Sequence, residues 1–155
     1  MSGDGHPCEV LTDAYYVDTA VTPLERARVC LWGPPTNVFR SWHELARVLG
    51  FTVAHVCEAR FHECKPNVLF SEVPPGAVDV VITDAWPQGL DAKAWSLSRQ
   101  QLEEIGNPRL LPTPPFKVGG ELDFDPVDYA GFCGYAQKEL LVPVQKAIVR
   151  YVFGA

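Results

Sequence analysis

A strand that leads directly into an amphipathic helix is the feature that most limits how this chain can fold. Residues 29–32 (VCLW) are apolar at every position, as in a strand buried on both faces of a sheet. A Gly-Pro-Pro loop follows, and residues 37–49 then place their apolar side chains on one helical face. Gly50 ends this helix. The segment therefore predicts one strand–loop–helix unit of an open α/β sheet.

The rest of the chain repeats this alternation of strands and helices. The predicted fold class is α/β: a single Rossmann-like domain with a parallel sheet, helices on both of its faces and a long C-terminal helix. Pro143 lies inside that last helix and should kink it. Residues 59–68 are expected to be a polar connector. Beyond the first unit, the predicted strands are 51–57, 78–83 and 109–111, and the predicted helices are 6–19, 97–105 and 134–153.

Composition is that of a globular protein and argues against several classes of partner. Of the 155 residues, 47% are hydrophobic, which is enough for one domain with a full core, and the formal net charge is −6. An acidic chain without a basic patch is a poor match for nucleic acid or anionic membrane surfaces. No apolar run approaches the roughly 20 residues of a membrane span. We expect residues 1–5 to be a disordered tail and residues 6–155 to be one domain.

The cysteines predict free thiols in a cytoplasmic protein, because the chain has five of them at wide spacing and no signal-peptide pattern. Two His-x-Cys pairs, His55/Cys57 and His62/Cys64, supply a ligand set that zinc accepts. Their spacing is not that of a zinc finger, however. We therefore expect no metal site, with a buried Cys57 and a solvated His62 instead. We also expect no cofactor.

Five stretches of the chain follow one another as in the second half of aspartate and ornithine carbamoyltransferases, and the chain resembles that family on them. Each motif alone is weak, but their order and spacing cover nearly the whole chain. The stretches are His-Pro-Cys-Glu at 6–9, the strand and helix start at 32–41, VITDAW at 81–86, Leu-Pro-Thr-Pro at 111–114, and Ala-Gln-Lys at 136–138 before an apolar helix.

The resemblance implies a domain that binds the second substrate, an amino acid such as ornithine or aspartate, or a related amine. In the family, a preceding domain carries a Ser-Thr-Arg-Thr-Arg loop that holds carbamoyl phosphate, and no such loop occurs in this sequence. We therefore expect a carbamoyltransferase-like domain that transfers a carbamoyl group when a separately encoded, carbamoyl-phosphate-binding chain completes it. A homo-oligomer or hetero-oligomer is expected.

The resemblance also assigns substrate-binding residues. Asn37 matches the asparagine that holds the amino acid, and Thr36 replaces a second asparagine with a hydroxyl donor. Asp84 matches an aspartate that contacts the α-amino group in the ornithine enzymes. Gln88 and Gly89 lie in a shortened version of the family's Trp-x-Ser-Met-Gly loop. On the residues alone, Thr36 and Asn37 are equally consistent with a plain helix cap, and Gly89 with a simple turn.

The expected catalytic residues are His6, Pro112 and Thr113. His6 matches the histidine that polarises the carbamoyl carbonyl as an oxyanion develops, and Pro112 and Thr113 lie in the matching proline-rich loop. On the residues alone, His6 is also consistent with an exposed residue near a mobile terminus. Three positions lack the group that the family uses there: Glu9 in place of a glutamine, Leu111 in place of a histidine, and Cys133 in place of an arginine.

These departures keep two alternatives open. The sequence is also consistent with a non-catalytic binding or regulatory module derived from a carbamoyltransferase, with a partner docked on its apolar faces. It is also readable as a different reaction on the same scaffold, because fold does not determine chemistry. Such a reaction would use an acid cluster, although we expect residues 121–125 to be a solvated loop. The cluster would comprise Asp84, Glu121, Asp123 and Asp125.

Overall fold

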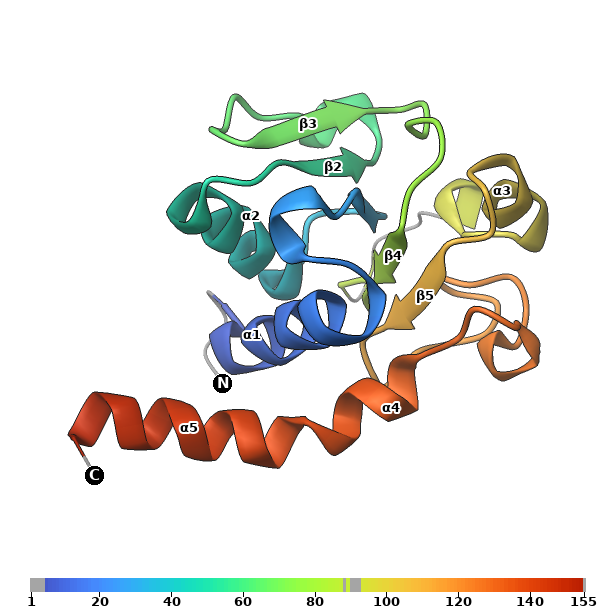
Figure 1. Cartoon of the computed structure of the whole chain (residues 1–155). Coiled ribbons are helices and arrows are strands. Elements are labelled where there is room, and N and C mark those ends of the chain that lie inside the picture. Colours follow the sequence, from blue (N-terminus) through green and yellow to red (C-terminus); the bar gives the residue numbers. More distant parts are fainter. Residues whose placement is uncertain (1–4, 88, 90–92, 155) are drawn as a thin grey trace.

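The computed structural model describes residues 5–87, 89 and 93–154, and shows a parallel five-stranded sheet in the order β3-β2-β1-β4-β5 (Figure 1). The chain runs outward from β1 to β3, crosses back to the other side of β1, and continues from β4 to β5. This arrangement confirms the predicted α/β, Rossmann-like fold. The strands are β1 (Val29–Trp32), β2 (Val53–Val56), β3 (Val68–Ser71), β4 (Val80–Thr83) and β5 (Arg109–Pro112).

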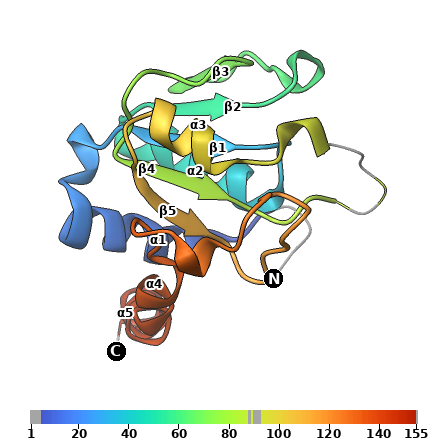
Figure 2. The same ribbon diagram turned by 90° about the vertical axis from the view of Figure 1, so that its right-hand side faces the viewer.

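Helices cover both faces of the sheet (Figures 1 and 2). Residues that alternate along β1 belong to two different core clusters, since Val29 and Leu31 pack with α1 and α2 whereas Cys30 and Trp32 pack with α3. A strand covered on both faces is apolar at every position, as β1 is. The helices are α1 (Pro7–Tyr16), α2 (Asn37–Leu49), α3 (Arg99–Glu104), α4 (Gly134–Glu139) and α5 (Leu141–Phe153), with short turns η1 (Val17–Val21), η2 (Leu24–Arg26), η3 (Ala59–Phe61), η4 (Lys93–Trp95) and η5 (Pro126–Asp128).

Strand β3 was not expected from the sequence, because residues 59–68 read as a connector and no strand was predicted between that connector and residue 78. It pairs only with β2, at the edge of the sheet, and its Leu69 is 65% exposed. An edge strand this short has no long apolar run to reveal it. Helix α3 is likewise shorter than predicted, because Leu97 instead pairs with Leu122 in an isolated bridge.

The predicted C-terminal helix is interrupted, as its proline suggested. It divides at Leu140 into α4 and α5. Pro143 has no amide hydrogen to donate to the Glu139 carbonyl one turn earlier, so the helical ladder breaks there. Helix α5 then extends past the body of the domain beside α1 (Figure 1), and none of its residues is buried.

The tail predicted over residues 1–5 falls almost wholly outside the described residues. Within the described part of the chain, no helix is long and apolar enough to cross a membrane.

A substitution of Leu31 tests whether the central strand is covered by helices on both faces of the sheet. The side chain of Leu31 on the central strand is fully buried, so Leu31→Ala should lower the free energy of unfolding by about 3 kcal/mol. Leu69→Ala on the exposed edge strand is the matched control and should change it by no more than about 0.5 kcal/mol. Urea unfolding followed by circular dichroism measures both; similar losses for the two variants would contradict the layer assignment.

Candidate functional site

Polar side chains gather at the carboxyl ends of β1 and β4, where the order of strands reverses. The two strands are neighbours, with Trp32 opposite Thr83 in register. The chain leaves β1 toward one edge of the sheet and leaves β4 toward the other. In open parallel sheets the crevice at such a switch point is where ligands bind. The loops that follow β1 and β4 therefore form the candidate site.

The loop after β1 ends in a firmly anchored helix start. The Thr36 hydroxyl oxygen accepts the Phe39 amide at 3.3 Å, and the Asn37 carboxamide oxygen accepts the Val38 amide at 3.0 Å. The Ser41 hydroxyl donates to the Asn37 carbonyl at 3.1 Å and accepts the amide of His6 at 2.8 Å. The N-terminal end of α2 and His6 are thus joined through Ser41, and His6 is half-buried rather than exposed.

Asp84, directly after β4, lies against this helix start. Asp84 is 9% exposed to solvent. Burial raises the pKa of its carboxyl group, whereas hydrogen bonds from the Thr36 hydroxyl and the Ala85 amide, and the nearby His6, lower it. Glu121 acts in the raising direction. For a carboxylate in these surroundings, binding of a cation is favourable, because an ammonium partner would offset the desolvation of the carboxylate.

Several buried polar atoms beside Asp84 have no hydrogen-bond partner among the described residues. They are the hydroxyls of Thr83 and Thr113 and the indole nitrogen of Trp86. The Thr113 amide donates to the Thr83 carbonyl at 2.8 Å, which brings the ends of β4 and β5 together. Buried polar groups are nearly always paired in proteins. Three unpaired ones next to a carboxylate are therefore available to a ligand.

Gly33 holds the two loops close together. Its φ of +119° is a backbone conformation that side chains rarely adopt, and a Cβ there would lie 3.1 Å from the indole nitrogen of Trp86. Its amide donates to the Val56 carbonyl at 2.9 Å, and its carbonyl accepts from His55 Nε2 at 2.8 Å. Only glycine permits this close approach.

The partner of His55 is a second buried histidine. His43 Nε2 lies 3.0 Å from His55 Nδ1, and both rings pack against Phe70. Sequence reasoning considered His55 only as a zinc ligand and overlooked His43. The available signal was a histidine next to the apolar face of the α2 helix. No group of three or more His, Cys, Asp or Glu side chains in the described ranges could hold a metal ion.

Most of the predicted site residues lie together at one edge of the sheet. His6, Thr36, Asn37, Asp84 and Thr113 lie at the carboxyl edge of the sheet, and Pro112 is the buried last residue of β5. Gly89 is exposed, in a turn with a φ of +81°. Gln88 lies outside the described residues.

One sequence expectation near the site is wrong. Glu121 does not belong to a solvated loop: it is 3% exposed, and its carboxylate accepts the Lys117 amide at 2.6 Å. The neighbouring Leu122 is fully buried and carries the loop into the core.

The three positions that depart from the family pattern have structural partners here. Glu9 forms an ion pair with Lys138. Leu111 is buried in the core, and the Cys133 thiol donates to the Leu110 carbonyl at 3.2 Å. Burial raises the pKa of Cys133 to about 11, so the thiol is neutral at physiological pH. None of these groups is placed to supply a fixed positive charge to an anion.

Comparison with known proteins yields relatives of one kind, although no family model matches the chain. The ornithine carbamoyltransferase of Methylobacillus flagellatus is 25% identical over 175 residues, covering 98% of this chain. That of Caulobacter vibrioides is 23% identical over 178 residues, covering the whole chain. The chain spans 57% of the length of each of these relatives.

Solved structures agree. The ornithine carbamoyltransferase of Burkholderia thailandensis superposes with a TM-score of 0.85 at 20% identity, over 97% of this chain and 56% of its own. The chain has a carbamoyltransferase fold. An N-acetyl-L-ornithine transcarbamylase superposes with a TM-score of 0.74 at 16% identity, over 94% of this chain and 56% of its own. The superposition on the Burkholderia enzyme covers nearly the whole of this chain and about half of that protein.

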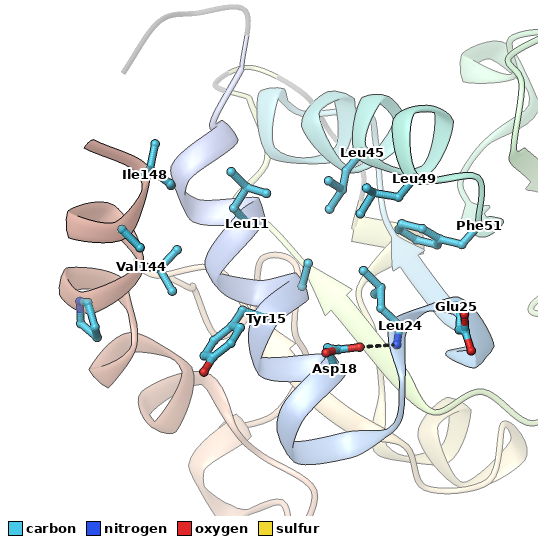
Figure 3. A pocket seen from close by; sticks show the side chains of 13 residues that line it. Leu11, Tyr15, Asp18, Leu24, Glu25, Leu45, Leu49, Phe51, Val144 and Ile148 are labelled. Carbon is cyan, nitrogen blue, oxygen red and sulfur yellow. Dashed lines mark hydrogen bonds between the residues drawn. The ribbon is translucent and has the colours of Figure 1, made fainter. Parts of the chain in front are cut away.

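A separate apolar groove of about 680 Å³ lies between α1, α2 and α5, away from the candidate site (Figure 3). Leu11, Val144 and Ile148 contribute to its wall, and Asp18 and Glu25 are the acidic residues that line it. Asp18 accepts the Leu24 amide at 2.9 Å and so shapes one end of the groove.

Gly33→Ala should disturb the candidate site more than a glycine substitution elsewhere. A side chain at a φ of +119° and 3.1 Å from the Trp86 indole is strained in both respects, so the loss of unfolding free energy should be about 2–3 kcal/mol. Gly50→Ala, at a φ of +75° with open space around it, should cost about 1 kcal/mol. Urea unfolding compares them; equal costs would show that the Trp86 contact is unimportant.

The buried histidines predict a pH dependence of stability. Burial, with a smaller effect of His55, Lys65 and Arg40, lowers the pKa of His43 to about 3, and burial lowers that of His55 to about 4. In the unfolded chain both titrate near 6.5, so between about pH 4 and 6.5 the unfolded state binds more protons. The free energy of unfolding should therefore fall as the pH decreases through this window.

His43→Gln isolates that contribution, because Asp13 and Asp84, with raised pKa values, act in the opposite direction in every variant. The variant should lose about 2 kcal/mol less than the wild-type chain between pH 7 and pH 5. Phe39→Leu, a buried neighbour that does not titrate, should show the wild-type difference. Urea unfolding at the two pH values decides; an unchanged difference in His43→Gln would mean that His43 is already protonated in the folded chain.

Proposed function

We propose that this chain is the amine-binding domain of a carbamoyltransferase-type enzyme, completed by a carbamoyl-phosphate-binding partner. The observation that supports it is the juxtaposition of Asp84 with Thr36 and the start of α2 at the switch point of the sheet. The carbamoyltransferase fold supports the class of reaction. The proposal covers ornithine, aspartate and other amines as the acceptor.

The two sides of the candidate site suit the two ends of an amino acid. The positive end of the dipole of the 13-residue helix α2 and the carboxamide nitrogen of the Asn37 side chain favour a carboxylate. Asp84 favours the ammonium group, and the unpaired hydroxyls of Thr83 and Thr113 can pair with the rest of the ligand. A simple amine would use the Asp84 side alone.

The chemistry needs little from this chain beyond positioning. The neutral amine nitrogen attacks the carbamoyl carbon, the new carbon–nitrogen bond forms as the bond to the phosphate oxygen breaks, and the proton that the amine loses passes to the departing phosphate. Holding the amine in line with the carbamoyl carbon is worth several kcal/mol of barrier, of order 7–11 in the best model systems. In this proposal His6, which acts electrostatically on Asp84, contacts the carbonyl oxygen that gains charge.

A carbamoyl-phosphate-binding partner is part of the proposal because this sequence does not supply the Ser-Thr-Arg-Thr-Arg loop that the resemblance assigns to the preceding domain. The apolar groove and the exposed residues Tyr151 and Phe153 of α5 offer a surface for such a partner. Apolar patches of this kind commonly mark protein contacts.

A second candidate function is a binding or regulatory module without turnover. It is favoured by the structural use of Glu9 and Cys133, which leaves the carbamoyl-phosphate side without donors from those positions. The two candidates share the amine site and differ in whether a carbamoyl group is transferred.

An assay of the chain alone and mixed with a polypeptide that carries the phosphate-binding loop separates them. With carbamoyl phosphate and ornithine, aspartate or a diamine, the mixture should release phosphate and form a ureido product. Asp84→Asn should reduce kcat/KM for the accepted amine by about 100-fold, since a charge-assisted contact is lost. Asp123→Asn, an exposed carboxylate of the nearby loop, is the control and should retain activity.

Binding of an amine by the chain alone, measured by calorimetry, without turnover in any mixture would favour the module. Absence of both binding and turnover with every acceptor would refute the amine site itself.

A further inference from the structure

The Gly33 carbonyl lies just past the end of the β1–β2 pairing and takes its hydrogen bond from a side chain. The register of the two strands ends with Trp32 opposite Val56. The next amide of β2, that of Cys57, donates to the Ser71 carbonyl of β3 at 3.0 Å. Among the described residues, the Gly33 carbonyl instead accepts a hydrogen bond from the side-chain nitrogen Nε2 of His55 at 2.8 Å.

This contact determines where the protons of both histidines lie. A carbonyl oxygen only accepts, so His55 Nε2 must carry a hydrogen. A neutral His55 then has an unprotonated Nδ1, which accepts from His43 Nε2 at 3.0 Å. His43 Nδ1 is left without a hydrogen, and it is buried without a partner among the described residues. The result is a one-way chain of donors from His43 through His55 to Gly33.

Aromatic side chains pack against the pair from two elements. Phe39 of α2 packs edge-on against His55 with ring centroids 5.2 Å apart, and Phe70 of β3 lies 5.0 Å from His55 and 5.5 Å from His43. Lys65 and Glu63, in the connection to β3, and Arg40 and His62 are the charged and titratable groups that act on the pair. The cage leaves the imidazoles few alternative orientations.

We propose that the His43–His55 pair is a positioning device for the amine site, in which His43 orients His55 so that His55 holds the Gly33 carbonyl. Two prolines follow Gly33 and stiffen the link to Thr36. Gly33 also contacts Trp86, two residues after Asp84. Displacing Gly33 therefore shifts both loops of the crevice. As a role in ligand binding, the proposal rests on the proposed function; the loop geometry itself does not.

Hydrogen exchange of the unliganded chain tests the device without knowledge of the ligand. His43→Leu removes the donor to His55, so the Gly33 amide, bonded to the Val56 carbonyl, should exchange about tenfold faster. The Thr113 amide, bonded to the Thr83 carbonyl at 2.8 Å, is the internal reference and should keep its rate. Failure of the amine assay would leave this readout intact, so the two proposals fail separately.

Conservative replacement separates positioning from packing. His43→Gln places a carboxamide donor near the former Nε2, so it should restore the wild-type exchange rate of Gly33. His62→Gln is the matched control, because His62 also stacks on Phe70 but contacts the Cys57 carbonyl at 3.0 Å instead of Gly33. It should leave Gly33 unchanged. Equal rates for Gly33 in His43→Leu and the wild type, or equal damage from leucine and glutamine, would overturn the proposal.

A measurement on the wild-type chain covers the case in which His43→Leu does not fold. Imidazole nitrogen-15 spectra should show His43 and His55 both as the neutral tautomer protonated at Nε2, unchanged between pH 7 and pH 5.5. A hydrogen on Nδ1 of His55, or conversion of His55 to imidazolium in this range, would overturn the proposed chain of donors.

Discussion

The peptide group of Gly33 is the constraint on which the candidate site depends. Its amide is bonded to Val56 and its carbonyl to His55, so the residue continues the β1–β2 contact for one position beyond the strands. Its bare Cα lets the Trp86 indole approach from the β4 side. The loops after β1 and β4 are thereby held close together, with Asp84 beside Thr36 at the start of α2.

The electrostatics of the site follow from its burial. Asp84 loses hydration at the end of a buried strand, and hydrogen bonds from Thr36 and Ala85 only partly offset this. The neutral His43–His55 pair adds no charge nearby, because burial keeps both pKa values well below their ordinary range. A carboxylate in a partly dry crevice without a fixed cationic partner is suited to a cationic ligand. This is the physical basis for proposing an amine.

The structure treats the proposed amine side and the proposed carbamoyl-phosphate side differently. The amine side keeps its polar groups, whereas Glu9 is engaged by Lys138 and Cys133 is buried as a neutral thiol. The exposed apolar residues of α5 and the groove beside α1 lie on another face of the domain. This asymmetry is the reason for the two proposals, an amine-binding domain that depends on a partner for its anion site and a module that keeps only binding.

The sequence by itself determined the units from which the fold is built. The apolar run of β1, the period of α2 and the helix-ending Gly50 are local signals, and the break at Pro143 follows from one missing amide hydrogen. The resemblance named Asp84 and Asn37 as site residues for the same reason: each directly follows or begins a recognisable element. Only the tertiary structure decided the strand order, the edge strand β3, the burial of Glu121 and the pairing of His43 with His55. These depend on contacts between segments that no local pattern links, since hydrogen bonds and burial are set by what packs opposite a side chain and not by its neighbours along the chain.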